Sequence, residues 1–169
     1  MISRRLFLAA SASGFAANVG ASVPQTGLHL IAQRSTNTLV FMGDGQPIMS
    51  FHAAFGREDG AKRLRDDART PIGEYLIRPA RASGRWRWFH PIDYPNARDI
   101  AEGRAQGLPK AALGDEIGLH GYGGWPPTDL AAAHGVGWNW TSGCIAVNHQ
   151  EIEIIRALIQ RPIPITIEP

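Results

Sequence analysis

The fold and the chemistry are decided around residues 141–147, which read Thr141-Ser142-Gly143-Cys144-Ile145-Ala146-Val147. Cys144 is the only cysteine of the 169 residues, so an internal disulfide is excluded. A lone cysteine is commonly a small buried hydrophobe, but the neighbours of this one favour a reactive thiol. Gly143 permits a backbone turn that other residues resist, and such a turn can aim successive N–H groups at one point. The segment is therefore typical of a nucleophile loop.

A thiol attacks as the thiolate, so Cys144 needs a base or a positive environment. A helix predicted to begin near Asn148 would favour the thiolate, although this effect fades beyond the first turn. Three histidines lie close in sequence, namely His120, His134 and His149. His120 ends a predicted strand, where a rigid element presents its side chain to a loop. It is the favoured base, with a satisfied core imidazole as the alternative, whereas the other two are expected on a loop and on the helix surface.

A zinc site is the rival interpretation of these same four side chains. The spacings from His120 to His134, Cys144 and His149 are 14, 10 and 5 residues in succession, and no CxxC or HExxH pair is present. The sequence therefore predicts neither a metal nor another cofactor.

Outward from this segment, short apolar runs alternate with turn signals, which is typical of a β-rich fold. Nineteen Gly and twelve Pro support the same class, which is mainly β (α+β). Strands are predicted at residues 28–32, 38–42, 48–55, 74–77, 86–89, 116–120 and 163–167, the last as an edge strand because it contains proline. Asn148 and Glu151 predict a capping box at the start of an amphipathic helix that ends at Arg161. Shorter helices are predicted at residues 98–106 and 128–134.

The N-terminus predicts export. Residues 1–21 carry Arg4 and Arg5, no acidic residue and a short apolar stretch of small side chains, as in a signal peptide. Residues 3–8 also fit the twin-arginine export signal, and an N-terminal helix of the mature fold is the alternative. We therefore expect a periplasmic, cell-wall-associated protein with no stable membrane span after signal removal.

The remaining chain is electrically balanced. Arg4 and Arg5 account for two of the 17 basic residues, which leaves 15 against 15 acidic residues. This balance gives no electrostatic reason to expect nucleic acid as a partner. A local basic run does occur, and it either forms a solvated surface or touches an anionic substrate. Its members are Arg78, Arg81, Arg85 and Arg87.

Several segments resemble the L,D-transpeptidase catalytic (YkuD-type) domain. Residues 117–121, Ile-Gly-Leu-His-Gly, are similar to the family's strand-end histidine, and residues 141–147 are similar to its Ser/Thr-x-Gly-Cys motif. Residues 70–75 after Gly56 fit the recurring TPxGxY/F segment. Residues 94–96 and the Trp140-Thr141 pair are especially similar to the YafK-type murein transpeptidase branch. The resemblance covers residues 27–168, which we expect to form one catalytic domain.

The resemblance implies a β-sandwich-like fold with the site in a groove under a loop. It implies that Cys144 attacks the carbonyl between the third and fourth residues of a peptidoglycan tetrapeptide stem and releases D-alanine. His120 would transfer the proton, and an amine from another stem or a wall-attached lipoprotein would accept the acyl group. The N–H groups of Gly143 and Cys144 are the implied oxyanion donors. The implied substrate-binding residues are Ser142, Thr141, Trp140, Gly121, Tyr94 and Asn96.

The sequence also departs from the family pattern. Many members carry His at the position of Ser142 and Arg or Asn at that of Ala146, where Arg can pair with a substrate carboxylate. Ala146 cannot, and residues 123–138 lengthen the loop before Cys144, where they are expected to form a lid. The alternatives to a transpeptidase are a peptidoglycan amidase or hydrolase on the same scaffold and a non-catalytic wall-binding module.

Overall fold

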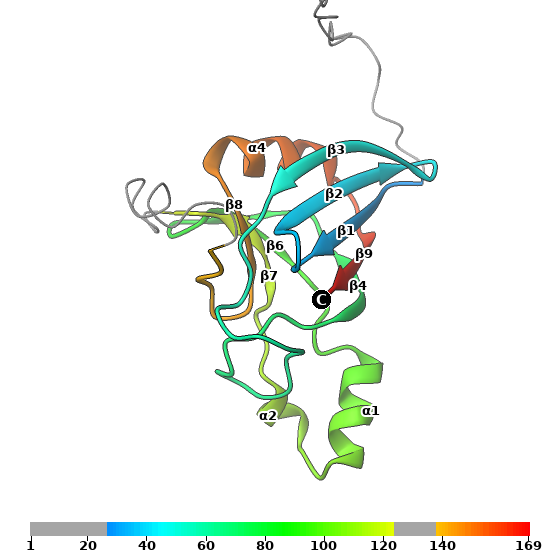
Figure 1. The fold of residues 1–169 in the computed structure, drawn as a ribbon, viewed down its shortest axis with the longest axis vertical. Helices are drawn as coiled ribbons and strands as arrows, with labels where there is room; N and C mark the ends of the chain where they lie inside the picture. The colour runs from blue at the N-terminus through cyan, green and yellow to red at the C-terminus, as the bar shows by residue number, and fades with distance from the viewer. Residues whose placement is uncertain (1–26, 124–137) are drawn as a thin grey trace, which may run out of the picture.

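Figure 1 shows the computed structural model, which describes residues 27–123 and 138–169. Three expectations lie outside the described residues: the signal peptide at residues 1–21, the helix at 128–134 that contains His134, and most of the lid at 123–138. No helix of the described part is long and apolar enough to cross a membrane.

The strands form two sheets, so the prediction of a mainly β, sandwich-like fold is confirmed. A five-stranded sheet has the order β3-β2-β1-β9-β4, with β1 (His29–Gln33), β2 (Thr38–Gly43), β3 (Gln46–His52), β4 (Gly73–Ile77) and β9 (Ile163–Glu168). A four-stranded sheet has the order β5-β6-β7-β8, with β5 (Arg81–Ser83), β6 (Arg87–Pro91), β7 (Gly118–Gly121) and β8 (Ile145–Val147). The described helices are α1 (Ala97–Ala105), α2 (Lys110–Leu113) and α4 (His149–Leu158).

The first three strands form the predicted antiparallel meander because both turns contain residues that tolerate a positive φ. Asn37 has φ 53° between β1 and β2, and Asp44 and Gly45 have φ 49° and 76° between β2 and β3. The third strand was expected to run to Phe55, but β3 ends at His52. Beyond it, Ala54 forms a bridge with Ala146, so the chain passes from one sheet to the other.

The prediction that the C-terminal strand lies at an edge is wrong. β9 is internal, parallel to β1 and antiparallel to β4. Pro164 is tolerated because no hydrogen bond to β1 or to β4 requires an N–H at this position. The N–H and C=O of its partner on β4, Leu76, bond to Asp93 instead, and the pairing with β1 starts one residue later, at Ile165.

A hairpin replaces the single strand predicted at residues 86–89. Its strands are β5 and β6, and the turn between them ends at Arg87, which has φ 66°. β8 was not predicted as a strand because three residues carry too little periodicity to be recognised. The capping box at Asn148 is present at the start of α4, and a second one at Asn96 starts α1.

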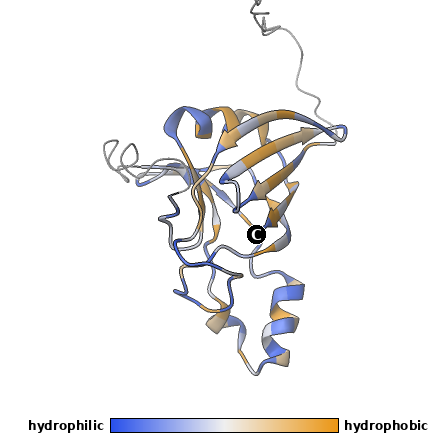
Figure 2. Ribbon diagram, viewed as in Figure 1, coloured by the Kyte–Doolittle hydropathy of each residue, from blue (hydrophilic) through white to orange (hydrophobic). Residues whose placement is uncertain are grey.

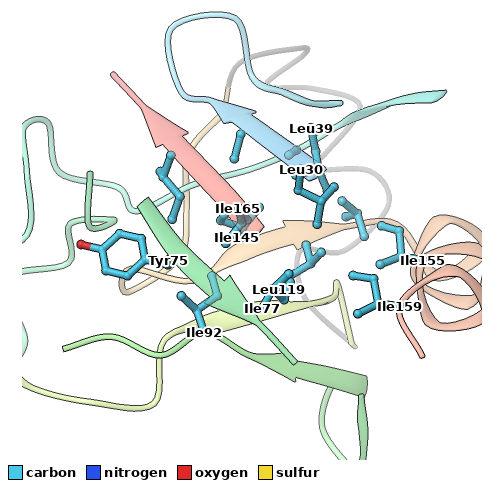
Figure 3. Close-up of a cluster of buried hydrophobic side chains, with 14 of the residues drawn as sticks. Leu30, Leu39, Tyr75, Ile77, Ile92, Leu119, Ile145, Ile155, Ile159 and Ile165 are labelled. Atoms are coloured by element: carbon cyan, nitrogen blue, oxygen red, sulfur yellow. The ribbon is translucent and has the colours of Figure 1, made fainter. Parts of the chain in front are cut away.

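The core lies between the two sheets and under α4. Leu30, Leu39 and Ile77 reach it from the five-stranded sheet, and Leu119 and Ile145 reach it from the other sheet (Figure 3). In Figure 2 the hydrophobic colour follows the strands, whereas the loop that connects β3 to β4 is largely hydrophilic. Side chains alternate along a strand, so the neighbours of Leu119 and Ile145 must face away from this core. Those neighbours are His120 and Cys144.

Candidate active site

The sulfur and the imidazole are brought together by the parallel pairing of β7 and β8. In this register Leu119 lies opposite Ile145, and His120 lies opposite Ala146. Cys144 directly precedes β8, so its side chain emerges on the same face as that of His120. Both side chains line one cavity of about 520 Å³, so the structure brings the predicted nucleophile and the predicted base to the same place.

The imidazole of His120 is fixed by its backbone neighbour and by an aromatic ring. Nδ1 lies 2.7 Å from the carbonyl oxygen of Gly121, and Trp86 stacks on the ring at a centroid distance of 4.2 Å. A carbonyl oxygen only accepts, so Nδ1 carries the proton and Nε2 of the neutral ring is free to act as a base. Burial lowers the pKa of His120 to about 4, and the charge of Arg85 acts in the same direction.

Cys144 rests as a thiol rather than as a thiolate. Its Sγ donates to the carbonyl oxygen of Glu116 at 3.6 Å, and its side chain is partly exposed. Burial raises the pKa of Cys144 to about 11, and the carboxylate of Glu116 acts in the same direction. The expected help from the N-terminus of α4 does not outweigh this desolvation, so thiol and imidazole are both neutral at pH 7.

Thr141 holds the nucleophile loop in place. Its buried hydroxyl accepts from the N–H of Gly143 at 3.1 Å and donates to the carbonyl oxygen of Cys144 at 2.6 Å. Gly143 has φ 130°, so the expected turn that other residues resist is present. The same bond occupies the N–H of Gly143, which was expected to be an oxyanion donor. In this conformation the Gly143 N–H therefore points at Thr141.

The remaining residues expected at the site divide into two groups. Ser142 and Trp140 line the cavity with Thr141, and the Trp140 ring meets the His120 ring edge to face at 6.3 Å. Ser142 is exposed, and its hydroxyl accepts from Arg57 at 3.4 Å. Gly121 contributes its carbonyl oxygen to His120 rather than a cavity surface.

Tyr94 and Asn96 were expected to bind substrate, and the structure corrects this expectation. Neither lines the cavity of Cys144. Tyr94 is buried with its hydroxyl donating to the carbonyl oxygen of Leu113 at 3.1 Å, and Asn96 caps α1 and donates to the carbonyl oxygen of Glu74 at 3.1 Å. Their polar groups are consumed in attaching α1 and α2 to the sheet.

Sequence reasoning missed part of the cavity wall. Trp86, Phe89 and Glu116 line it, and no motif pointed to them. The basic run gave a partial signal, because Arg81 and Arg85 line the cavity whereas Arg87 pairs with Glu153 on α4. Phe89 lies opposite His120 in the pairing of β6 with β7, so long-range strand pairing brings the hairpin to the site.

Cys144 is also reached from a second side. A smaller pocket of about 160 Å³ is lined by Cys144 and Ser142 together with both acidic and basic side chains, namely Asp66, Asp115, Glu116, Lys62 and Arg65. The described residues contain no group of three or more His, Cys, Asp or Glu side chains placed to hold a metal ion, and His149 is exposed on α4.

Fold and site together define a two-sheet β domain built around a cysteine–histidine pair. The chain belongs to the YkuD family, the L,D-transpeptidase catalytic domain, whose family model matches residues 28–166. No curated protein sequence matches it.

Solved structures share this fold at low sequence identity. The helical cell shape determining protein Pgp2 from Campylobacter jejuni is 21% identical, with a TM-score of 0.61 over 83% of this chain and 47% of that chain. Bd1075 from Bdellovibrio bacteriovorus is 20% identical, with a TM-score of 0.58 over 83% and 47%. An L,D-transpeptidase from Mycobacterium smegmatis is 13% identical, with a TM-score of 0.53 over 85% and 59%. The chain thus spans about half the length of these proteins.

Proposed function

We propose that this protein is a cysteine-dependent L,D-transpeptidase that acts on peptidoglycan tetrapeptide stems. The observation that carries the proposal is the shared cavity, which is lined both by the only cysteine of the chain and by an imidazole whose Nε2 is unprotonated. Membership of the YkuD family supports the same chemistry. Peptidoglycan lies outside the cytoplasm, so the proposal requires export to the periplasm, and residues 1–21 would be the export signal.

In the first half-reaction, Sγ of Cys144 attacks the carbonyl carbon between the third and fourth residues of the stem. Because thiol and imidazole are both neutral at rest, Nε2 of His120 takes the thiol proton as the bond forms. Collapse of the tetrahedral intermediate breaks the peptide bond, and His120 protonates the leaving nitrogen of D-alanine. A thioester on Cys144 remains.

In the second half-reaction, an amine attacks the thioester and His120 takes the proton that the amine loses. Sγ leaves as the acyl group is transferred, and the proton returns to it from His120. The second pocket at Cys144 offers a separate approach for the acceptor, and its lining carries both acidic and basic side chains, with Arg65 bonded to Asp115. The acceptor would be another stem or a wall-attached lipoprotein.

The developing oxyanion needs backbone donors near the sulfur. In the proposed mechanism the N–H of Cys144 is the first donor. The N–H of Gly143 could contribute only after it leaves the hydroxyl of Thr141, to which it is bonded at 3.1 Å.

The experiment is to incubate the purified protein with a disaccharide tetrapeptide and to read the products by mass. Loss of D-alanine with formation of cross-linked dimers supports the proposal, and Cys144→Ser should abolish both. Trimmed monomers without dimers would indicate a hydrolase on the same scaffold. An unchanged substrate with retained wall binding would indicate a non-catalytic module. A carbapenem should add its mass to the protein, but not to the Cys144→Ser variant.

A further inference from the structure

Two cationic side chains and one carboxylate line the described part of the cavity wall. Arg81, Arg85 and Glu116 all line it. Arg81 pairs with Glu116 at 2.6 Å and lies over the Phe89 ring at 4.8 Å, so these two charges offset each other. Arg85 has no carboxylate partner within residues 27–123 and 138–169. The described wall therefore carries one unneutralised cation.

Arg85 is held in place by an aromatic surface. Its guanidinium carbon lies 4.3 Å from the centroid of the Trp86 ring, within the range of a cation–π interaction. Trp86 also stacks on His120 at 4.2 Å. Stacking restricts the guanidinium while its N–H edge stays able to donate, and a planar fork of this kind matches a carboxylate. The guanidinium of Arg85 and the imidazole of His120 thus contact the same indole ring and line the same cavity.

The usual cation of the family motif is missing from this chain. Ala146, at the position where many members carry Arg or Asn, is fully buried on β8 and can neither donate nor carry charge. Ala146 therefore cannot bind any carboxylate of the substrate. Arg85 reaches the same cavity from the β5–β6 turn.

We propose that Arg85 is a specificity-determining residue that binds a carboxylate of the donor stem peptide. This inference rests on the proposed function. The stem offers two such groups next to the scissile bond: the terminal carboxylate of D-alanine and the second carboxylate of diaminopimelate. Both would bind the guanidinium through the same pair of charge-assisted hydrogen bonds.

The test measures peptide binding by calorimetry in the Cys144→Ser background, so that turnover does not interfere. The ligands are the tetrapeptide with both carboxylates free, its terminal amide, and the peptide amidated on the second diaminopimelate carboxyl. Each is measured with and without Arg85→Gln. The matched control is Arg87→Gln, which lies two residues away, pairs with Glu153 and does not line the cavity.

Arg85→Gln should weaken binding of the free peptide by about 10- to 100-fold, the usual range for losing a charge-assisted contact. One of the two amides should bind more weakly by a similar factor, and Arg85→Gln should then cause no further loss. The amide that shows this behaviour identifies the carboxylate. Arg87→Gln should leave all affinities unchanged.

Two results would overturn the inference. One is that the free peptide is preferred over its amides by the same factor with and without Arg85→Gln, and the other is that no peptide binds. Turnover of the disaccharide tetrapeptide by the unmodified protein is followed separately. A protein that binds through Arg85 but releases no D-alanine would refute the proposed function and leave the carboxylate site standing.

Discussion

The Nδ1–H of His120 is donated to the carbonyl oxygen of Gly121, the next residue along the chain, at 2.7 Å. A backbone carbonyl rather than a carboxylate therefore sets the tautomer of the base. A carboxylate would stabilise the imidazolium, whereas a neutral carbonyl does so only weakly. Burial is left to dominate, which is why the pKa of His120 falls to about 4.

The first prediction concerns the ionisation of Cys144. With a pKa of about 11, its rate of alkylation by iodoacetamide should rise tenfold per pH unit from pH 7 to pH 10. Glutathione, whose thiol has an ordinary pKa, should depart from the tenfold slope at about pH 8.5 and serves as the control. A plateau for Cys144 below pH 8 would show a standing thiolate and contradict the neutral pair.

The second prediction concerns the hydroxyl of Thr141. Thr141→Val keeps the shape of the side chain but leaves the Gly143 N–H and the Cys144 carbonyl without their partner. We expect a loss of about 1–3 kcal/mol in the free energy of unfolding, together with loss of activity, because the nucleophile loop loosens. Thr141→Ser keeps the hydroxyl and should recover most of both. Equal urea midpoints for the Val and Ser variants would exclude the hydroxyl as the cause.

The third prediction concerns the backbone at Gly143. A Cβ there would lie 2.7 Å from the carbonyl oxygen of Arg69 and 3.1 Å from Ile117, at φ 130°. Gly143→Ala should therefore reduce the free energy of unfolding by about 1–3 kcal/mol and abolish acylation by a carbapenem. Gly84→Ala is the matched control, because a Cβ at Gly84 meets nothing within 4 Å. Urea denaturation should place that control within about 0.5 kcal/mol of the parent protein.

The fourth prediction concerns stability in acid. His90 is fully buried, its Nδ1 bonds to the carbonyl oxygen of Arg78 at 2.9 Å, and its Nε2 has no partner among the described residues. Burial lowers the pKa of His90 to about 4, and the charge of Arg156 adds to this. The unfolded chain, with a histidine pKa near 6.5, binds the proton first. Stability is therefore lost as pH falls from about 6.5 to about 4.

Each buried histidine of this kind should lower the free energy of unfolding by roughly 2 kcal/mol when the pH falls from 7 to 4.5. In His90→Leu the difference in the free energy of unfolding between the two pH values should shrink by the contribution of His90. The contribution of His120 should remain. Urea denaturation at the two pH values measures it, with His149→Gln on the exposed face of α4 as the control. An unchanged pH difference in His90→Leu would show that His90 does not take up a proton on unfolding.

The parts of the site that consist of a few consecutive residues could be predicted from the sequence. Cys144 and Gly143 stand in one motif, and the capping box at Asn148 starts α4 as expected. His120 lies in the predicted strand, although β7 runs from Gly118 to Gly121 and so ends one residue after it. The same local reading failed for Tyr94 and Asn96, because a recognisable motif does not reveal whether its polar groups face a cavity or the protein itself.

Long-range pairing accounts for what could not be predicted. Trp86 reaches His120 only because β6 pairs with β7, and nothing in residues 81–91 specifies that partner. The internal position of β9 is hidden in the same way, since its proline suggested an edge. Strand order depends on contacts between distant segments, which local periodicity does not encode.

The place of β9 between β1 and β4 has a consequence for how the chain matures. β1 can pair with β9 only after residues 163–168 have been synthesised, more than a hundred residues after β1 itself. Until those residues leave the ribosome, β4 has no neighbour to join it to β1, and the sheet is two separate fragments. The five-stranded sheet can therefore be completed only after residues 163–168 have been synthesised, which makes its assembly depend on contacts between distant segments.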